Sequence, residues 1–154
     1  DGLAITEALK VMIVLEYISL EATPLYNMGL VIGFSLIPMF YFNFKKQNKI
    51  FLGDAGSLFL GTVIAIYLFH VLGSNYNLRP EFKMNKPLLA ITVIIYPLLD
   101  LLRVFIIRIA QKKSPFHPDQ NHLHHLLLKK GIPHLWGVII IQLISVGVLL
   151  LGLI

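Results

Sequence analysis

The segment Ile50-Phe51-Leu52-Gly53-Asp54-Ala55-Gly56-Ser57 leads directly into the apolar run Leu58 to Leu72. It places one carboxylate, Asp54, between two glycines where a charged loop meets a helix of membrane length. An ionisable group at such a position is costly and marks a candidate functional site. The two glycines, Gly53 and Gly56, let a ligand approach the backbone closely.

Two interpretations of Asp54 stay open on this chemistry. A helix that starts near Ala55 directs its free N–H groups and its positive dipole end toward whatever lies beside Asp54. This suits a phosphate bridged to Asp54 by a hard cation, because Mg²⁺ is commonly held by one or two carboxylates together with substrate phosphates. The alternative is a helix N-cap, a frequent role of aspartate.

The composition is that of a polytopic membrane protein. Hydrophobic residues make up 56% of the chain, charged residues 14%, and the mean hydropathy is +0.77. A soluble domain carries about 25% charged residues, so a soluble enzyme is excluded. The absence of cysteine excludes disulfides and thiolate metal sites. The net charge of +5 lies in loops, which favours membrane orientation or phosphate contacts and no nucleic-acid partner.

The apolar runs predict an all-α fold, a polytopic transmembrane helix bundle with about five membrane segments, forming one domain over residues 1–154. The segments run approximately from Leu3 to Leu20, Leu25 to Phe44 (with a kink at Pro38), Ala55 to Gly73, Pro87 to Ala110 and Trp136 to Ile154. The first is the weakest span because it carries Glu7, Lys10 and Glu16. Glu7 and Lys10 are three residues apart and are expected to pair.

The chain starts at Asp1 without methionine or a basic leader segment, within what looks like a motif. We therefore expect it to be the C-terminal part of a longer protein.

Five spans place the polar stretches on two sides of the membrane. Asp1, residues 43–54 and residues 111–134 fall on one side, and the loops around Glu21 and Arg79 fall on the other. The first side carries more basic residues: Lys45, Lys46, Lys49, Lys112, Lys113, Lys129 and Lys130. Positive residues mark cytoplasmic loops, so the sequence predicts a cytoplasmic site.

Asp100 is a second carboxylate within an apolar segment. It follows Pro97 and precedes Arg103 by three residues, which predicts an ion pair near a kinked, cytoplasm-facing helix end. Arg103 and Arg108 are expected to extend toward the membrane interface.

The longest polar loop concentrates histidines in the pattern His122-x-His124-His125. Three interpretations stay open: a zinc site, a solvated or membrane-surface loop, and a phosphate-binding loop. Zinc is disfavoured because no cysteine is present and the nearest carboxylate is Asp119. A helix would also place His122 and His125 on one face and direct His124 elsewhere.

Phe51-Leu52-Gly53-Asp54-Ala55-Gly56-Ser57-Leu58, followed by Leu60-Gly61, resembles the signature of the polyprenyl-phosphate N-acetylhexosamine-1-phosphate transferases, glycosyltransferase family 4. Asp1-Gly2-Leu3-Ala4 is similar to the end of the family's DGxDGLA motif. Ser114-Pro115-Phe116, Pro118-Asp119 and His122-x-His124-His125 resemble the HxHH loop of the undecaprenyl-phosphate N-acetylglucosamine-1-phosphate branch. Gln120 departs from that pattern, where arginine is common.

The resemblance implies roles for individual residues. Asp54 and Asp1 are the implied catalytic positions, with Asp54 the ligand of Mg²⁺ (or Mn²⁺). Phe51 is implied to pack on the uracil. The remaining implied substrate-binding residues are Gly53, Asn43, Asp100, Asp119, His122, His124 and His125. Lys112, Lys113 or the histidines are expected to compensate for the charge missing at Gln120.

The resemblance also implies the activity: transfer of N-acetylglucosamine 1-phosphate from a UDP-sugar to undecaprenyl phosphate, with release of UMP, early in cell-envelope polysaccharide synthesis. The implied location is the inner (plasma) membrane, with the active site on the cytoplasmic face. A homodimer stays open, and the segment alone is expected to be inactive. Two other classes stay open beside this enzyme: a transporter or metal-handling protein that uses the carboxylates and histidines, and a non-catalytic membrane scaffold.

Overall fold

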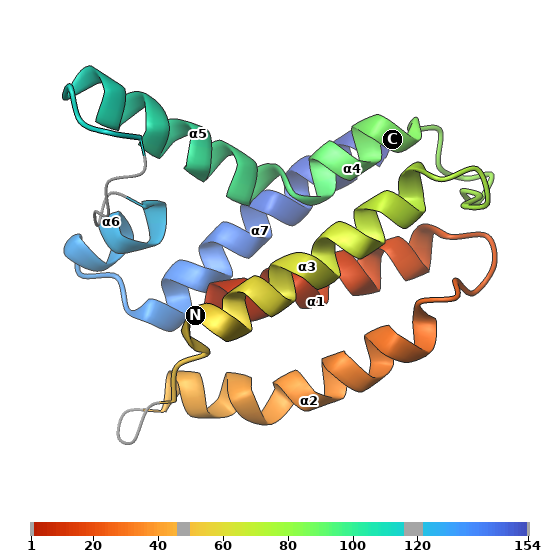
Figure 1. Cartoon of the computed structure of the whole chain (residues 1–154), viewed down its shortest axis with the longest axis horizontal. Coiled ribbons are helices and arrows are strands. Elements are labelled where there is room, and N and C mark those ends of the chain that lie inside the picture. Colours follow the sequence, from red (N-terminus) through yellow and green to blue (C-terminus); the bar gives the residue numbers. More distant parts are fainter. Residues whose placement is uncertain (1, 46–49, 116–121, 154) are drawn as a thin grey trace.

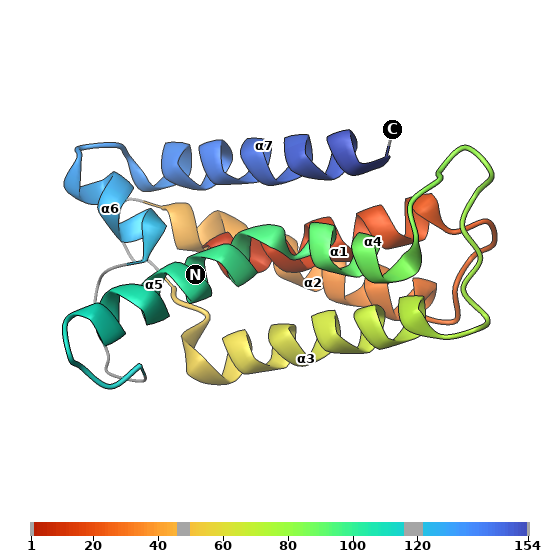
Figure 2. The ribbon, with the colours of Figure 1, turned by 90° about the horizontal axis from the view of Figure 1, so that it is seen from above.

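The computed structural model describes residues 2–45, 50–115 and 122–153. Within them lie the helices α1 (Gly2–Ile18), α2 (Tyr26–Phe44), α3 (Gly53–Leu72), α4 (Lys86–Val93), α5 (Ile95–Ala110), α6 (Leu123–Lys129) and α7 (His134–Leu153), shown in Figures 1 and 2. The described residues form no strand, only an isolated bridge between Ser19 and Leu78. The all-α prediction is confirmed.

Helix α1 is the centre of the bundle and packs against α2, α3, α4 and α7. Its buried apolar side chains recur every three or four residues, as one stripe of a helix requires: Ile5, Ala8, Val11, Met12, Leu15 and Ile18. Glu7 and Lys10 are also buried on α1. Glu7 and Lys10 therefore belong to the protein interior, whereas Glu16 of the same segment is half-buried.

Among the described residues, three helices, α2, α3 and α7, are long and apolar enough to cross a membrane, and a fourth crossing results if α4 and α5 form one broken span. Helix α1, with 17 residues, is outside this set. At 1.5 Å per residue it reaches about 26 Å, slightly less than the thickness of a bilayer core. The polytopic bundle is confirmed, and the straight spans are fewer than the five segments predicted.

The predicted fourth segment is bent by 67° between α4 and α5. The break lies at Ile94, and Pro97 is in the first turn of α5. A proline ring clashes with the carbonyl of the residue four positions earlier, which here is Val93, the last residue of α4. The kink expected at Pro97 therefore forms three residues upstream of the proline.

Helix α5 ends in a tight reversal. The amides of Lys112 and Lys113 donate to the carbonyls of Ile109 (2.9 Å) and Arg108 (2.9 Å), and Lys112 has a positive φ of 55°. This is a Schellman ending with lysine at the position that usually holds glycine. Arg108, expected to reach the membrane interface, is instead buried and donates to the carbonyl of Pro115. The arginine therefore helps to hold the chain after the reversal.

Candidate functional site

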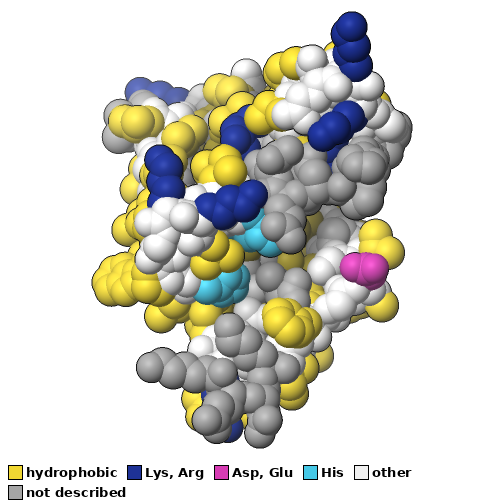
Figure 3. Space-filling view, turned by 90° about the vertical axis from the view of Figure 1, so that its left-hand side faces the viewer, with side chains coloured by type: hydrophobic (Ala, Val, Ile, Leu, Met, Phe, Trp, Pro, Cys, Tyr) yellow, Lys and Arg dark blue, Asp and Glu magenta, His cyan; other side chains and the backbone are white. Residues whose placement is uncertain are grey.

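One end of the bundle gathers the segments that carry the candidate residues. The end of α2, the start of α3, the end of α5, helix α6 and the start of α7 all lie there, whereas the α1–α2 and α3–α4 connections lie at the opposite end (Figures 1 and 2). Viewed from this end, histidine and basic side chains lie around a partly hydrophobic surface (Figure 3). The arrangement agrees with the two sides expected from the order of the segments.

Asp54 lies in the first turn of α3 and is exposed. It makes no ion pair or side-chain hydrogen bond with any other described residue. The N-cap interpretation is wrong: α3 begins at Gly53, and the N-cap position is held by Leu52 without a side-chain cap. Both carboxylate oxygens are therefore free of protein partners in the described structure.

Two glycines shape the backbone around Asp54. Gly53 has φ of +69°, a conformation that glycine adopts without the steric cost paid by other residues. A Cβ atom at Gly56 would lie 2.6 Å from the side chain of Leu52, so this glycine leaves room for Leu52 to pack over the first turn. Phe51, the residue expected on the uracil, is 67% exposed beside this turn.

Asn43 is buried at the end of α2, where its Nδ2 donates to the carbonyl of Ile50 (3.2 Å). It therefore ties together the ends of the loop that leads to Asp54. Its Oδ1 is buried without a hydrogen-bond partner in the described structure. A Cβ atom at Gly2 would lie 3.0 Å from this Oδ1 and 2.3 Å from the ring of Phe44, so Gly2 packs tightly against Asn43. Asp1, Asp119 and Gln120 lie outside the described residues.

Asp100 is 9% exposed and connects α5 to the histidine loop. Its Oδ2 lies 2.8 Å from His122 Nδ1, and its Oδ1 accepts from the amide of Leu123 (2.8 Å). The expected pair with Arg103 is present, but the Nη1–Oδ1 distance is 3.9 Å. The closest partners of Asp100 are thus the ring of His122 and the amide of Leu123, whereas the sequence spacing indicated only Arg103.

The three histidines lie together at the start of α6. His122 is the N-cap residue, and its ring centroid lies 6.0 Å from that of His124, which is 4.1 Å from that of His125. The expectation that His124 points away from the other two is wrong. The helical-face argument fails because His122 is outside the helix, with extended backbone angles of −59° and 147°.

His124 has an environment that keeps its ring neutral. Burial, and then the charge of neighbouring His125, lower the pKa of His124 to about 4. Its Nδ1 is buried without a hydrogen-bond partner among the described residues. The described residues contain no group of three histidine, aspartate or glutamate side chains placed to hold a metal, so the zinc interpretation gains no support.

The predicted Glu7–Lys10 pair is confirmed at 2.7 Å. The structure adds two partners from α7 that the sequence analysis missed: Ser145 Oγ lies 2.7 Å from Lys10 Nζ, and Gln142 donates to Glu7 (2.9 Å). These two polar residues, three positions apart in an otherwise apolar helix, were the available signal. The network joins α1 to α7 and leaves both charges fully paired.

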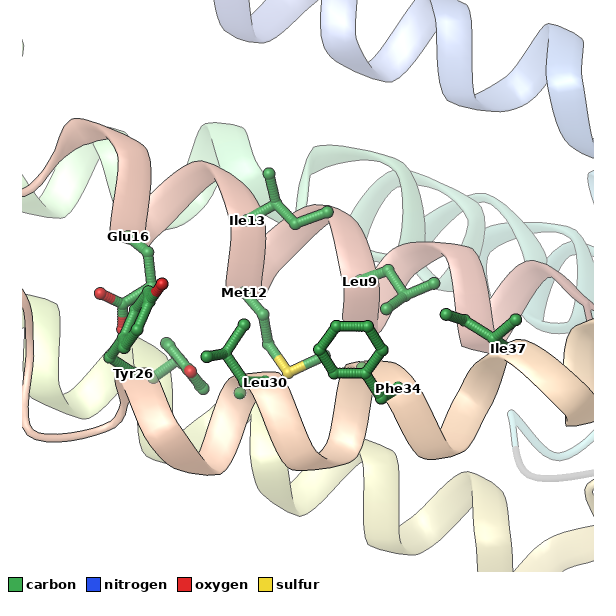
Figure 4. A pocket seen from close by; sticks show the side chains of 11 residues that line it. Leu9, Met12, Ile13, Glu16, Tyr26, Leu30, Phe34 and Ile37 are labelled. Carbon is green, nitrogen blue, oxygen red and sulfur yellow. The ribbon is translucent and has the colours of Figure 1, made fainter.

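An apolar groove of about 500 Å³ between α1 and α2 lies apart from these residues. Figure 4 shows Tyr26 beside Glu16 at one end of it and Phe34 and Ile37 toward the other. Glu16 is engaged by the hydroxyl and amide of Thr23. The lining of the groove is therefore mainly hydrophobic.

The donor set at Asp54 fits a hard divalent cation. An exposed carboxylate with two uncommitted oxygens can supply one ligand while water and phosphate oxygens supply the others, which is the usual manner of Mg²⁺ binding. The histidines are poorer ligands for such a cation because it prefers oxygen.

Comparisons with known proteins agree with these features. A family model described as glycosyl transferase family 4 matches residues 1–72. An undecaprenyl-phosphate alpha-N-acetylglucosaminyl 1-phosphate transferase from Pasteurella multocida is 33% identical over 70% of this chain and 29% of its own length. The enzyme of that name from Escherichia coli (strain K12) is 34% identical over 68% of the chain and 28% of its own length.

A decaprenyl-phosphate N-acetylglucosaminephosphotransferase from Mycobacterium leprae is 38% identical over 71% of the chain and 28% of its own length. No solved structure gives a significant match. The chain thus spans less than a third of these three relatives. On the family model and these identities, the chain belongs to glycosyl transferase family 4.

Proposed function

We propose that this chain forms part of an enzyme that transfers N-acetylglucosamine 1-phosphate from UDP-N-acetylglucosamine to undecaprenyl phosphate and releases UMP. The observation that carries the proposal is the grouping of the Asp54 turn and the histidine loop at one end of an apolar helix bundle (Figure 1). This arrangement suits a reaction between a water-soluble nucleotide sugar and a lipid whose phosphate lies at the membrane surface. The names of the three relatives support the same reaction class.

The reaction is a phosphoryl transfer. A phosphate oxygen of the lipid forms a bond to the β-phosphorus of the UDP-sugar. The bond from that phosphorus to the bridging oxygen breaks, and UMP leaves with this oxygen and the bonding electron pair. Such transfers depend mainly on positioning and charge neutralisation, so the protein needs few covalent roles.

Asp54 would hold Mg²⁺ (or Mn²⁺) through its free carboxylate oxygens. When bound there, the cation would neutralise negative charge on the diphosphate. Phe51 is sufficiently exposed to stack on the uracil. His124 and His125 would contact the phosphates by hydrogen bonds, and neutral His124 would do so without adding charge. His122, whose Nδ1 lies 2.8 Å from Asp100, would bind the sugar by accepting a hydrogen bond from one of its N–H or O–H groups at Nε2.

The proposed location is the inner membrane with the site facing the cytoplasm. Five exposed lysines occupy the end of the bundle that carries Asp54 and the histidines: Lys45, Lys112, Lys113, Lys129 and Lys130. Basic residues are retained on the cytoplasmic side of membrane proteins, where UDP-sugars are also found.

The experiment is an assay of UMP release by the complete protein in membranes supplied with UDP-N-acetylglucosamine, undecaprenyl phosphate and Mg²⁺. We expect release that requires all three. Release that does not depend on the lipid phosphate would contradict the proposed acceptor, and the absence of release would contradict the function. The chain of 154 residues by itself is expected to be inactive.

The transporter alternative requires carboxylates along a path through the membrane. Glu7 is instead paired with Lys10 and Gln142, and Asp100 with His122 and Leu123. No observation on the described residues favours transport over group transfer.

A further inference from the structure

We propose that Asp100 is a positioning residue that fixes the orientation and tautomer of His122, and that it does not itself bind substrate. The proposal rests on the transferase function proposed above. The geometry that carries it is the pair of 2.8 Å contacts from one buried carboxylate, to the ring of His122 and to the amide of Leu123.

The carboxylate has little capacity left for a ligand. Oδ2 is used by the imidazole, and Oδ1 by the Leu123 amide, with the Arg103 guanidinium at 3.9 Å. The side chain is 9% exposed. A substrate phosphate would also be repelled by a carboxylate. Asp100 is thus shielded from the solvent-facing part of the site, while the His122 side chain retains 35% exposure.

The contact defines which ring nitrogen of His122 carries the proton. An ionised carboxylate only accepts hydrogen bonds, so Nδ1 must be the donor. In neutral His122 this leaves Nε2 with its lone pair, and in the protonated ring both nitrogens donate. A histidine held through one nitrogen by a carboxylate presents the other in a fixed direction, as metal-ligating histidines do.

The same carboxylate also fixes the place of the histidine loop. Asp100 and His122 are 22 residues apart, and the contact joins the second turn of α5 to the residue that precedes α6. The rings of His124 and His125 follow directly. Orientation at His122 therefore influences the whole cluster.

Asp100→Asn separates the two roles. The Leu123 amide can only donate, so the single amide oxygen of asparagine is expected to accept from it and to keep the loop in place. The side-chain NH₂ then faces Nδ1 of His122, which must become an acceptor, and the ring proton moves to Nε2. An aspartate-to-asparagine change has this effect on the histidine of the serine protease triad. Asp100→Ala removes both contacts and serves as the matched variant.

The readouts are the imidazole ¹⁵N resonances of His122 in the complete protein, assigned by their loss in His122→Asn, and the kinetics of UMP release. We expect the Nδ1–H form in the wild type and the Nε2–H form in Asp100→Asn, with wild-type thermal stability. In the wild type the Nε2 lone pair would accept a hydrogen bond from an N–H or O–H group of the sugar, and the Nε2–H of Asp100→Asn cannot accept it. We therefore expect a KM for the UDP-sugar raised about tenfold with kcat nearly unchanged, the signature of lost substrate binding.

An Nδ1–H tautomer retained in Asp100→Asn, or an altered tautomer with unchanged KM and kcat, would overturn the proposal. Loss of activity in Asp100→Ala with full activity in Asp100→Asn would also overturn it, because Asp100 would then only hold the loop in place. His122→Asn is an independent test, since its side-chain amide can still donate to Asp100 while Nε2 is lost. We expect the KM for the UDP-sugar to rise as in Asp100→Asn. A wild-type KM in His122→Asn would contradict the proposal. The resonances are recorded without substrate, so they test positioning even if the wild type shows no UMP release, a result that would count against the proposed function alone.

Discussion

Asp54 and Asp100 are carboxylates at the same end of the bundle, yet their surroundings differ in every respect. Asp54 is exposed in the first turn of α3 and has no partner among the described residues. Asp100 is buried on α5 and has both oxygens engaged at 2.8 Å. The first retains its lone pairs for a ligand, and the second uses them to hold the protein together.

Glu7 extends the comparison to the bundle interior. It resembles Asp100 in being buried with short-range partners, Lys10 and Gln142. A buried charge must be paired because desolvation disfavours the ionised form. The structural carboxylates therefore differ from the candidate ligand-binding carboxylate in having hydrogen-bond or ion-pair partners within the protein. The presence of a carboxylate in an apolar segment does not by itself distinguish the two kinds.

The largest expected effect is at Asp54, the carboxylate without a partner among the described residues. Asp54→Asn preserves size but removes the charge, and we expect turnover of the complete enzyme to fall by about a thousandfold, since preorganised electrostatics would be lost beside the transferring phosphate. Because Asp54 is exposed, stability should change by less than about 0.5 kcal/mol. UMP release and thermal unfolding measure the two effects. Glu21→Gln, an exposed carboxylate at the opposite end, is the control and should be active; a fully active Asp54→Asn would remove the distinction between the two acids.

Breaking the buried ion pair between Glu7 and Lys10 should instead affect the stability of the fold. Lys10→Met leaves Glu7 buried without its ion partner, and we expect a loss of about 3 kcal/mol in the free energy of unfolding. The double variant Glu7→Gln, Lys10→Met should recover much of it, because no unpaired charge remains. Lys83→Met alters an exposed lysine in the opposite loop and should be nearly neutral. Thermal unfolding in detergent tests the series, and equal losses in the single and double variants would show that the pairing is irrelevant.

The histidine cluster should show an effect of intermediate size. His124→Ala is expected to raise the KM for the UDP-sugar about tenfold, the value of one hydrogen bond to a charged phosphate. Binding of Mg²⁺ should persist, because a hard cation prefers oxygen ligands. Kinetics at saturating and limiting Mg²⁺ separate the two outcomes, and a loss of metal affinity in this variant would place the histidine at the cation.

The smallest effect concerns pH. The pKa of His124 is lowered to about 4 in the folded protein and is about 6.5 in an unfolded chain, so the unfolded state binds more protons between these values. Stability should therefore fall as the pH falls from about 6.5 to 4, by about 1 kcal/mol after allowance for solvent around a half-buried ring. His124→Gln should flatten this dependence in thermal unfolding scans, and an unchanged slope would contradict the assignment of a half-buried, neutral ring.

Much of the fold follows from hydrophobic segments alone. Helices α2, α3 and α7 lie within two residues of their predicted bounds, because long apolar runs leave little alternative. The Glu7–Lys10 pair also follows from local spacing. Helix α6 was missed because its seven residues lie within a polar loop that shows no clear periodicity.

The contacts around the second carboxylate could not be derived from the sequence. Spacing along one helix indicated Arg103 for Asp100, whereas the closest partners come from 22 and 23 residues away. These partners follow the tight reversal at Lys112 and Lys113 that ends α5, a turn that spacing along one helix does not reveal. The break at Ile94 similarly depends on a clash between Pro97 and an earlier carbonyl.

The most direct test of the central claim is Mn²⁺ binding to the complete protein, followed by electron paramagnetic resonance with Mn²⁺ replacing Mg²⁺. We predict that the wild type and Asp100→Asn bind Mn²⁺ with similar affinity in the presence of a UDP-sugar, whereas Asp54→Asn binds it at least tenfold more weakly. Equal affinity in the wild type and Asp54→Asn, or a loss confined to Asp100→Asn, would contradict the assignment of the exposed carboxylate to the cation and the buried one to the protein.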